Sequence, residues 1–125
     1  MPFSPNRSLF MQRDRLLISE IVDAAQRIVE LTDGASTDVL DHDRDRRDAL
    51  LWSFTVLGEA CNQVSESTKR SNPHIEWAGP ASLRNRLVHN YWQVNSNVLL
   101  SISQDDVPRL LVGARLAHLE GSVSR

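Results

Sequence analysis

The residue types best suited to chemistry lie in one short stretch, Arg84-Asn85-Arg86-Leu87-Val88-His89-Asn90-Tyr91. It contains two guanidinium groups, an imidazole and a phenol. Histidine titrates near neutral pH without perturbation, so it can act as an acid or a base. Arginine is a permanent cation whose planar fork of donors fits a phosphate. We therefore take this stretch as the candidate site.

Such a set of groups could cleave RNA without a metal or cofactor. Cleavage needs a base for the 2′-hydroxyl proton, an acid for the leaving 5′-oxygen, and a cation for the charge on the pentavalent phosphorus. His89 would supply acid or base and Arg84 the cation, with Asn85 and Arg86 as supporting polar residues. On spacing alone, an arginine and a histidine five residues apart also occur on many solvated helix faces, and this alternative stays open.

Helix geometry favours a site shared between two chains. Residues five apart on an ideal helix are rotated by roughly 140° and separated by about 7.5 Å along the axis. Arg84 and His89 of one chain therefore do not stack on each other. In a two-fold dimer, the commonest oligomer arrangement, both residues of both chains could line one cleft.

Other candidate sites are weaker. His42, His74 and His118 are expected at the surface or in turns, and Cys61 in the core, because it lies on an apolar seam. Asp41, Asp43 and Asp45 alternate like a calcium loop but lack its glycine and closing glutamate. No Cys/His spacing is typical of zinc, and no phosphate-binding glycine loop is present.

The bulk composition is that of a globular protein. The chain has 125 residues and a formal net charge of -2, so we expect one domain over residues 1–125, with a loose arm at 1–6 and a frayed tail at 121–125. The charge disfavours a protein that coats nucleic acid but not an enzyme with a small cationic site. We see no membrane-spanning run or secretory signal, and the single cysteine fits a reducing cytoplasm.

Apolar residues recur at three- and four-residue steps, which predicts helices. The first should cover residues 7–32 and end at Gly34, and the second residues 44–69, after a polar connector (35–47) in which Asp41 or Asp43 can cap it. Its seam comprises Leu50, Phe54, Leu57, Cys61 and Val64.

Further helices are predicted over residues 80–89, anchored by Leu83, Leu87 and Val88, and over residues 95–120. Pro108 should split or restart the last of these. No segment alternates with period two, so we expect an all-α bundle of four to five helices running up and down. Two long antiparallel helices would pack together, with shorter ones toward the C-terminus.

Four motifs occur in this sequence: Leu57-Gly58-Glu59-Ala60, Ile75-Glu76-Trp77, Arg84-x4-His89-x-Tyr91 and the tract from Asp105 to Leu111. With them the sequence resembles the HepT-like toxins, a branch of the HEPN superfamily: the arginine–histidine–tyrosine run matches the family's motif, and the first motif its Gly-Glu-Ala signature. Ile75-Glu76-Trp77 is similar to its Ile-Pro-Trp turn, and Asp105 to Leu111 to its Asp-Leu-Pro-x-Leu tract. Together these cover about residues 14 to 119, in the family's order.

The resemblance implies a dimeric helical bundle and a metal-independent ribonuclease of the toxin–antitoxin type. Arg84 and His89 would be catalytic, and Asn85 would be the supporting polar residue. Tyr91 matches the tyrosine to which an MntA-like nucleotidyltransferase antitoxin adds AMP groups. Phosphates on that phenol would block the cleft and repel an RNA phosphate.

Two departures affect the segment after the motif. Asn90 replaces the family's glycine, and Trp92-Gln93-Val94-Asn95 lacks its aspartate. Neither removes a catalytic group, but both put the loop geometry and antitoxin recognition in question. Two other functions stay open: a non-catalytic module that binds RNA or a nucleotide and partners a nucleotidyltransferase, and a purely structural bundle, which the motif cluster disfavours.

Overall fold

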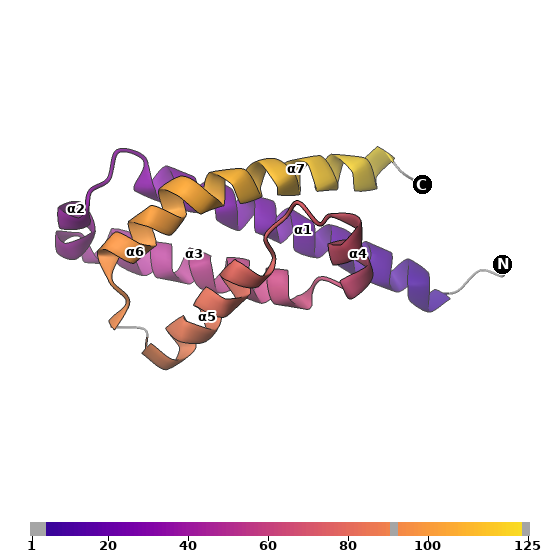
Figure 1. Cartoon of the computed structure of the whole chain (residues 1–125), viewed down its shortest axis with the longest axis horizontal. Helices are drawn as coiled ribbons and strands as arrows, with labels where there is room; N and C mark the ends of the chain where they lie inside the picture. The colour runs from indigo at the N-terminus through magenta and orange to yellow at the C-terminus, as the bar shows by residue number, and fades with distance from the viewer. Residues whose placement is uncertain (1–4, 91–92, 124–125) are drawn as a thin grey trace.

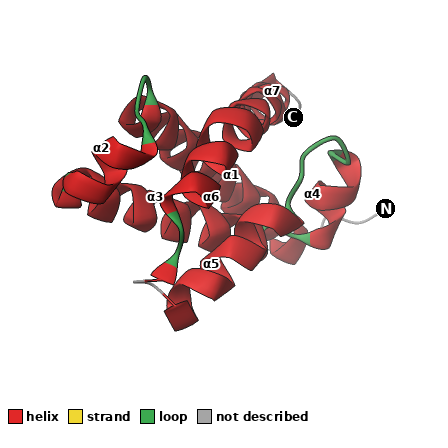
Figure 2. Cartoon of the chain, turned by 60° about the vertical axis from the view of Figure 1, so that its left-hand side comes forward, coloured by secondary structure: helices red, strands yellow, loops and turns green. Residues whose placement is uncertain are grey.

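The computed structural model describes residues 5–90 and 93–123, with side-chain surroundings for residues 12–90 and 93–120. This part of the chain is all-helical and contains no strand (Figures 1 and 2). Residues 5–6 of the expected arm and 121–123 of the expected tail are helical; the rest of the arm and tail, like Tyr91 and Trp92, lies outside the described residues.

Two long helices, α1 (Pro5–Thr32) and α3 (Arg44–Gln63), form the centre of the bundle. α7 (Val107–Val123) packs on α1, and α5 (Ala78–Asn90) packs on α3 (Figure 1). The predicted all-α bundle is thus confirmed. Every residue of the predicted seam on the second helix is buried, namely Leu50, Phe54, Leu57, Cys61 and Val64.

The polar connector contains a short helix, α2 (Thr37–His42). α1 ends just before Gly34, whose φ of 67° is a conformation that glycine adopts without strain. Asp43 caps α3, because its carboxylate accepts a hydrogen bond from the Arg46 backbone N–H at 3.1 Å. Of the two predicted caps, Asp43 is therefore the one used.

The prediction of one helix over residues 44–69 is wrong. α3 ends at Gln63, and a separate helix, α4 (Glu66–Ser71), begins after the N-cap Ser65. The buried Asp14 carboxylate accepts hydrogen bonds from the Ser65 N–H at 3.1 Å, the Ser65 hydroxyl at 2.6 Å, and the Thr68 hydroxyl. A carboxylate on α1, distant in sequence, thus stabilises the break.

The C-terminal helices run on without interruption. α6 (Ser96–Ser101) passes through a π-helical turn, η2 (Ile102–Asp106), into α7. Pro108 was expected to split or restart this segment: it does not split the helical run, and α7 begins at Val107, one residue before it. A proline ring clashes with the carbonyl four residues earlier in a regular helix, and the wider π turn just before Pro108 relieves such crowding. Two apolar side chains of α7, Leu116 and Leu119, are exposed.

Within the described ranges, none of the helices is both long enough and apolar enough to cross a bilayer.

Candidate functional site

α5 is held against α3 by an unusually close approach at Gly58. A Cβ atom there would lie 2.3 Å from the Arg84 Cβ and 2.4 Å from the Pro80 carbonyl oxygen. Any side chain at position 58 would therefore push the two helices apart. Leu83 and Leu87 are buried as predicted, whereas Val88, expected to be a third anchor, is 57% exposed.

The close approach places the Arg84 guanidinium beside Glu59. Arg84 Nη2 lies 2.9 Å from Glu59 Oε2, and Nη1 donates to Asn85 Oδ1 at 3.2 Å. The Arg84 side chain is 33% exposed, and its Nε is buried with no hydrogen-bond partner among the described residues. The guanidinium is thus oriented by α3 while part of it faces solvent.

Glu59 is itself held by a chain of polar side chains. Gln63 Nε2 donates to Glu59 Oε1 at 2.6 Å, and Arg13 Nη2 donates to Gln63 Oε1 at 2.8 Å. This network borders a hollow of about 230 Å³ between α1 and α3, of which Arg84 and Trp52 form part of the wall. The hollow is large enough for a small group such as a phosphate.

His89 lies in the last turn of α5 with its side chain exposed. It has no hydrogen bond or ion pair with any residue that the structure describes. Asn85 and Arg86 are also exposed. The structure therefore joins Arg84 to Asn85 but not to His89 within one chain.

Glu59 is the residue that sequence reasoning missed. It entered only as the centre of the Gly-Glu-Ala signature, without a role. That signature was the available signal, because the glycine permits the approach of α5 and the glutamate binds the arginine it brings.

The departures from the family pattern have local structural roles. Glu76, in place of the proline, accepts hydrogen bonds from the N–H groups of Ala78 at 3.1 Å and Gly79 at 3.4 Å, so it caps α5. Asn95 caps α6 by accepting from the Asn97 N–H at 2.7 Å. Asparagine and aspartate cap helices about equally well, so capping at position 95 survives the loss of the aspartate.

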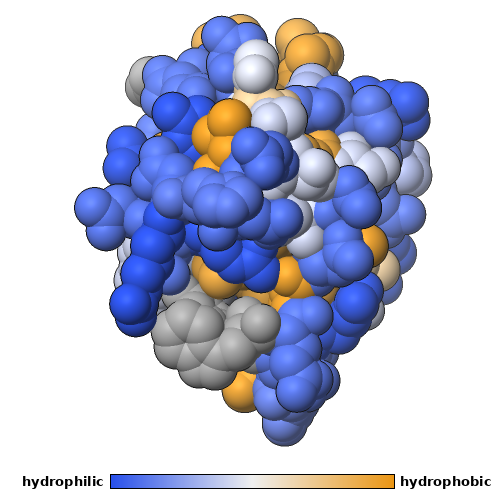
Figure 3. Space-filling view, turned by 90° about the vertical axis from the view of Figure 1, so that its left-hand side faces the viewer, coloured by the Kyte–Doolittle hydropathy of each residue, from blue (hydrophilic) through white to orange (hydrophobic). Residues whose placement is uncertain are grey.

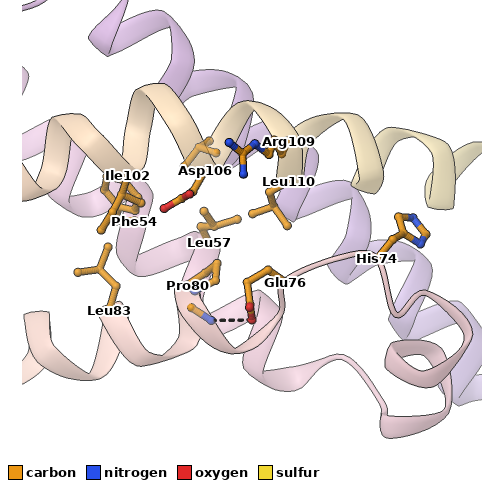
Figure 4. Close-up of a pocket in the computed structure, with 12 residues that line it drawn as sticks. Phe54, Leu57, His74, Glu76, Pro80, Leu83, Ile102, Asp106, Arg109 and Leu110 are labelled. Carbon is orange, nitrogen blue, oxygen red and sulfur yellow. Dashed lines mark hydrogen bonds between the residues drawn. The ribbon is translucent and has the colours of Figure 1, made fainter.

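A larger hollow, about 480 Å³, lies elsewhere between α3, the start of α5 and the η2–α7 junction (Figure 4). Its floor is apolar, with Phe54, Leu57 and Leu83, and its rim carries Asp106 and Arg109. Neither Arg84 nor His89 lines it. We assign the candidate site by the chemistry of the side chains rather than by the size of the hollow.

The remaining candidates do not form a second site. Cys61 is fully buried, as expected for a core residue, and burial raises the pKa of its thiol to about 12. His42 and His74 are exposed as predicted, and His118 is half-buried. No group of three His, Cys, Asp or Glu side chains that could hold a metal ion occurs in the described part of the chain.

Comparison with known proteins agrees with the resemblance of the motifs. The family described as Ribonuclease HepT-like matches residues 21–115. "Putative RNase MJ0127" of Methanocaldococcus jannaschii is 28% identical over 94 residues, covering 75% of this chain and 78% of its own. "Probable ribonuclease HepT" of Thermococcus cleftensis is 28% identical over 93 residues, covering 74% and 84%. No solved structure gives a significant match. Since the family matches most of the sequence, the chain belongs to the HepT-like ribonuclease family.

Proposed function

We propose that this protein is a toxin of a toxin–antitoxin system that cleaves RNA internally and without a metal, using Arg84 and His89. The observation that carries the proposal is the placement of Arg84. A guanidinium is held 2.9 Å from Glu59 at the wall of a hollow, with part of its donor set facing solvent. On the same helix lies the exposed His89 imidazole, which has no hydrogen bond or ion pair with the described residues.

The chemistry follows from these two groups. A neutral imidazole removes the 2′-hydroxyl proton, and the resulting alkoxide attacks the adjacent phosphorus. The bond from phosphorus to the 5′-oxygen breaks, and a protonated imidazole supplies that oxygen with a proton. The products are a 2′,3′-cyclic phosphate and a 5′-hydroxyl. Arg84 binds the phosphoryl oxygens as their charge increases.

One imidazole can serve as base and then as acid, or the His89 side chains of two copies can share the two steps; in either case a dimer would bring imidazole and guanidinium of different chains into one cleft. Three apolar side chains on three helices around the smaller hollow are exposed: Leu16 (69%), Trp52 (67%) and Val88 (57%). Trp52 and Arg84 line the hollow. Leu16 is the neighbour in sequence of Leu17, which also lines it, and Val88 lies one helical turn after Arg84. A second copy that buries this surface would bring the two pairs of Arg84 and His89 together.

The partner that restrains such a toxin would be an MntA-like nucleotidyltransferase antitoxin. Tyr91, outside the described residues, comes two positions after the exposed His89. AMP groups on its phenol would add negative charge and bulk next to the imidazole, and RNA phosphates would be repelled.

Cleavage of RNA by the purified protein in the presence of a chelator tests the enzymatic proposal. We expect His89→Ala and Arg84→Ala to abolish cleavage, and His74→Ala, which alters an exposed histidine outside the site, to leave it intact. Trp52→Glu should yield monomers with little activity. Full activity of the His89→Ala protein would remove that imidazole from the mechanism.

The alternative is a module that binds RNA or a nucleotide without cutting it. Two measurements separate the proposals. Binding of RNA by the wild-type protein without any cleavage would favour the module. Co-expression with a nucleotidyltransferase antitoxin should add mass in multiples of AMP, and unchanged modification of Tyr91→Phe would show that another residue is the acceptor.

A further inference from the structure

A single arginine on α3 joins the body of the bundle to the chain that comes after α5. Arg47 Nη1 donates to the Ser96 hydroxyl at 2.6 Å, and Arg47 Nη2 donates to the Val94 carbonyl oxygen. These partners are 49 and 47 residues away in the sequence. Val94 and Ser96 are both buried.

The same hydroxyl extends the network to α2. Ser96 Oγ accepts from Arg47 and donates to Asp41 Oδ1 at 2.6 Å. One serine thus joins α2, α3 and the start of α6. These hydrogen bonds are partly buried, and the surface at this end of the molecule is largely hydrophilic (Figure 3).

An arginine is well suited to this position. The Val94 carbonyl precedes the cap of α6, where the backbone has left one helix and not yet entered the next. The two ends of a guanidinium can bind that carbonyl and the hydroxyl at once, in a fixed plane. A lysine ammonium carries a point charge on a flexible stem and defines no such plane.

This contact matters because His89 lies between two anchored points of the chain. The first half of α5 is fixed to α3 at Gly58 and Glu59. His89, in the last turn, has no hydrogen bond or ion pair of its own in the described structure. Arg47 binds the chain at Val94, five residues after His89.

We propose that Arg47 is a positioning residue for His89. By fixing Val94 and Ser96, it sets the end of α5 and hence the place of the imidazole relative to Arg84. The effect of Arg47 on catalysis rests on the proposed ribonuclease function, whereas its effect on the surroundings of His89 does not depend on that function.

The neighbouring Arg46 provides a matched control. It lies on the same helix, is similarly half-buried, and also binds a backbone carbonyl, that of Leu31 at 3.3 Å, together with Asp43. Its contacts are with the end of α1 and the cap of α3, not with the chain after α5. Arg46→Ala and Arg47→Ala thus remove comparable groups from different places.

Two measurements on these variants, each in the full-length protein, test the proposal. In NMR spectra, we expect the His89 imidazole resonances and the amide-exchange protection of residues 94–101 to change in Arg47→Ala but not in Arg46→Ala. In cleavage assays, we expect Arg47→Ala to lower kcat about tenfold with little change in KM, since small displacements of a reacting group slow catalysis strongly. Free guanidinium at a non-denaturing concentration should partly restore kcat in Arg47→Ala only.

Equal losses of kcat in the two variants, or unchanged His89 resonances in Arg47→Ala, would overturn the proposal. If the wild-type protein does not cleave RNA, the ribonuclease proposal fails. The NMR comparison then still decides whether Arg47 positions His89.

Discussion

The two ends of α5 are held in different ways. At the first end, Pro80 and Arg84 lie against Gly58, and the guanidinium is bound to Glu59. At the last turn, Val88 and His89 are exposed. One chain therefore holds the Arg84 guanidinium firmly but leaves the His89 imidazole on an open surface. Packing within the chain thus places Arg84, whereas no contact with the other described residues fixes the His89 side chain.

Gly58→Ala should produce the largest effect, because it disrupts the packing of the first end of α5 against α3. The new Cβ would meet the Pro80 carbonyl oxygen at 2.4 Å, and backbone cannot yield as a flexible side chain can. We expect a loss of about 3 kcal/mol in the free energy of unfolding, measured by urea denaturation, together with loss of RNA cleavage.

Gly79→Ala is the control for that substitution. Its Cβ would lie 3.6 Å from the nearest atom, the Glu76 Cγ, which is an ordinary contact. Stability should be unchanged or rise by up to about 1 kcal/mol, because alanine favours helix over glycine. Equal stability of the two variants would show that the close approach at Gly58 is unimportant.

Glu59→Gln should affect stability less than Gly58→Ala. It removes the ion pair that orients Arg84 but leaves the packing of α5 at Gly58 intact. The carboxylate is 41% exposed and Arg84 33% exposed, so solvent screening limits the stability lost to under about 1 kcal/mol. Without the ion pair the guanidinium loses its fixed place. We expect kcat to fall about tenfold while RNA binds at least as tightly, because a negative charge beside the phosphate is gone. An unchanged kcat would mean that Glu59 does not orient Arg84.

His42 offers the smallest effect and a comparison with the exposed His89. Its pKa is raised above the ordinary value of 6.5, first by a hydrogen bond with the Asp38 backbone carbonyl and next by the Asp38 carboxylate. A raised pKa in the folded state adds stability below pH 6.5, which is lost as the pH rises through the raised value.

Asp38→Asn should therefore lower the NMR-measured pKa of His42. It should also slightly reduce stability at about pH 5.5 but not at about pH 8. The pH dependence of RNA cleavage should be the same in this variant as in the wild type. A shift of the cleavage profile would show that α2 influences the site.

Patterns of neighbouring residues correctly predicted the buried seam of the second long helix and the cap at its start. The seam from Leu50 to Val64 is buried, and Asp43 caps α3. The break after Gln63 was missed because it depends on Asp14, which lies about fifty residues earlier. The continuous helix through Pro108 was missed because a proline in a sequence does not reveal a π turn before it.

The candidate site was chosen by residue type, which located Arg84 and His89 but not their surroundings. The Glu59–Arg84 ion pair depends on the register between α3 and α5, and the sequence does not state that register. Periodicity assigned Val88 to the core, but its side chain is 57% exposed, on a side of α5 that the other described residues leave uncovered. This error is informative, because an apolar residue left exposed beside the site favours a second copy there.

Mixing two inactive proteins tests the central claim that Arg84 and His89 act together across two copies. In a heterodimer of Arg84→Ala and His89→Ala chains, neither chain holds both groups, but Arg84 of one and His89 of the other share the cleft. Subunits exchanged by mild denaturation and refolding should regain part of the RNA cleavage that each parent lacks. A refolded mixture that contains heterodimers and remains as inactive as its parents would contradict the shared site.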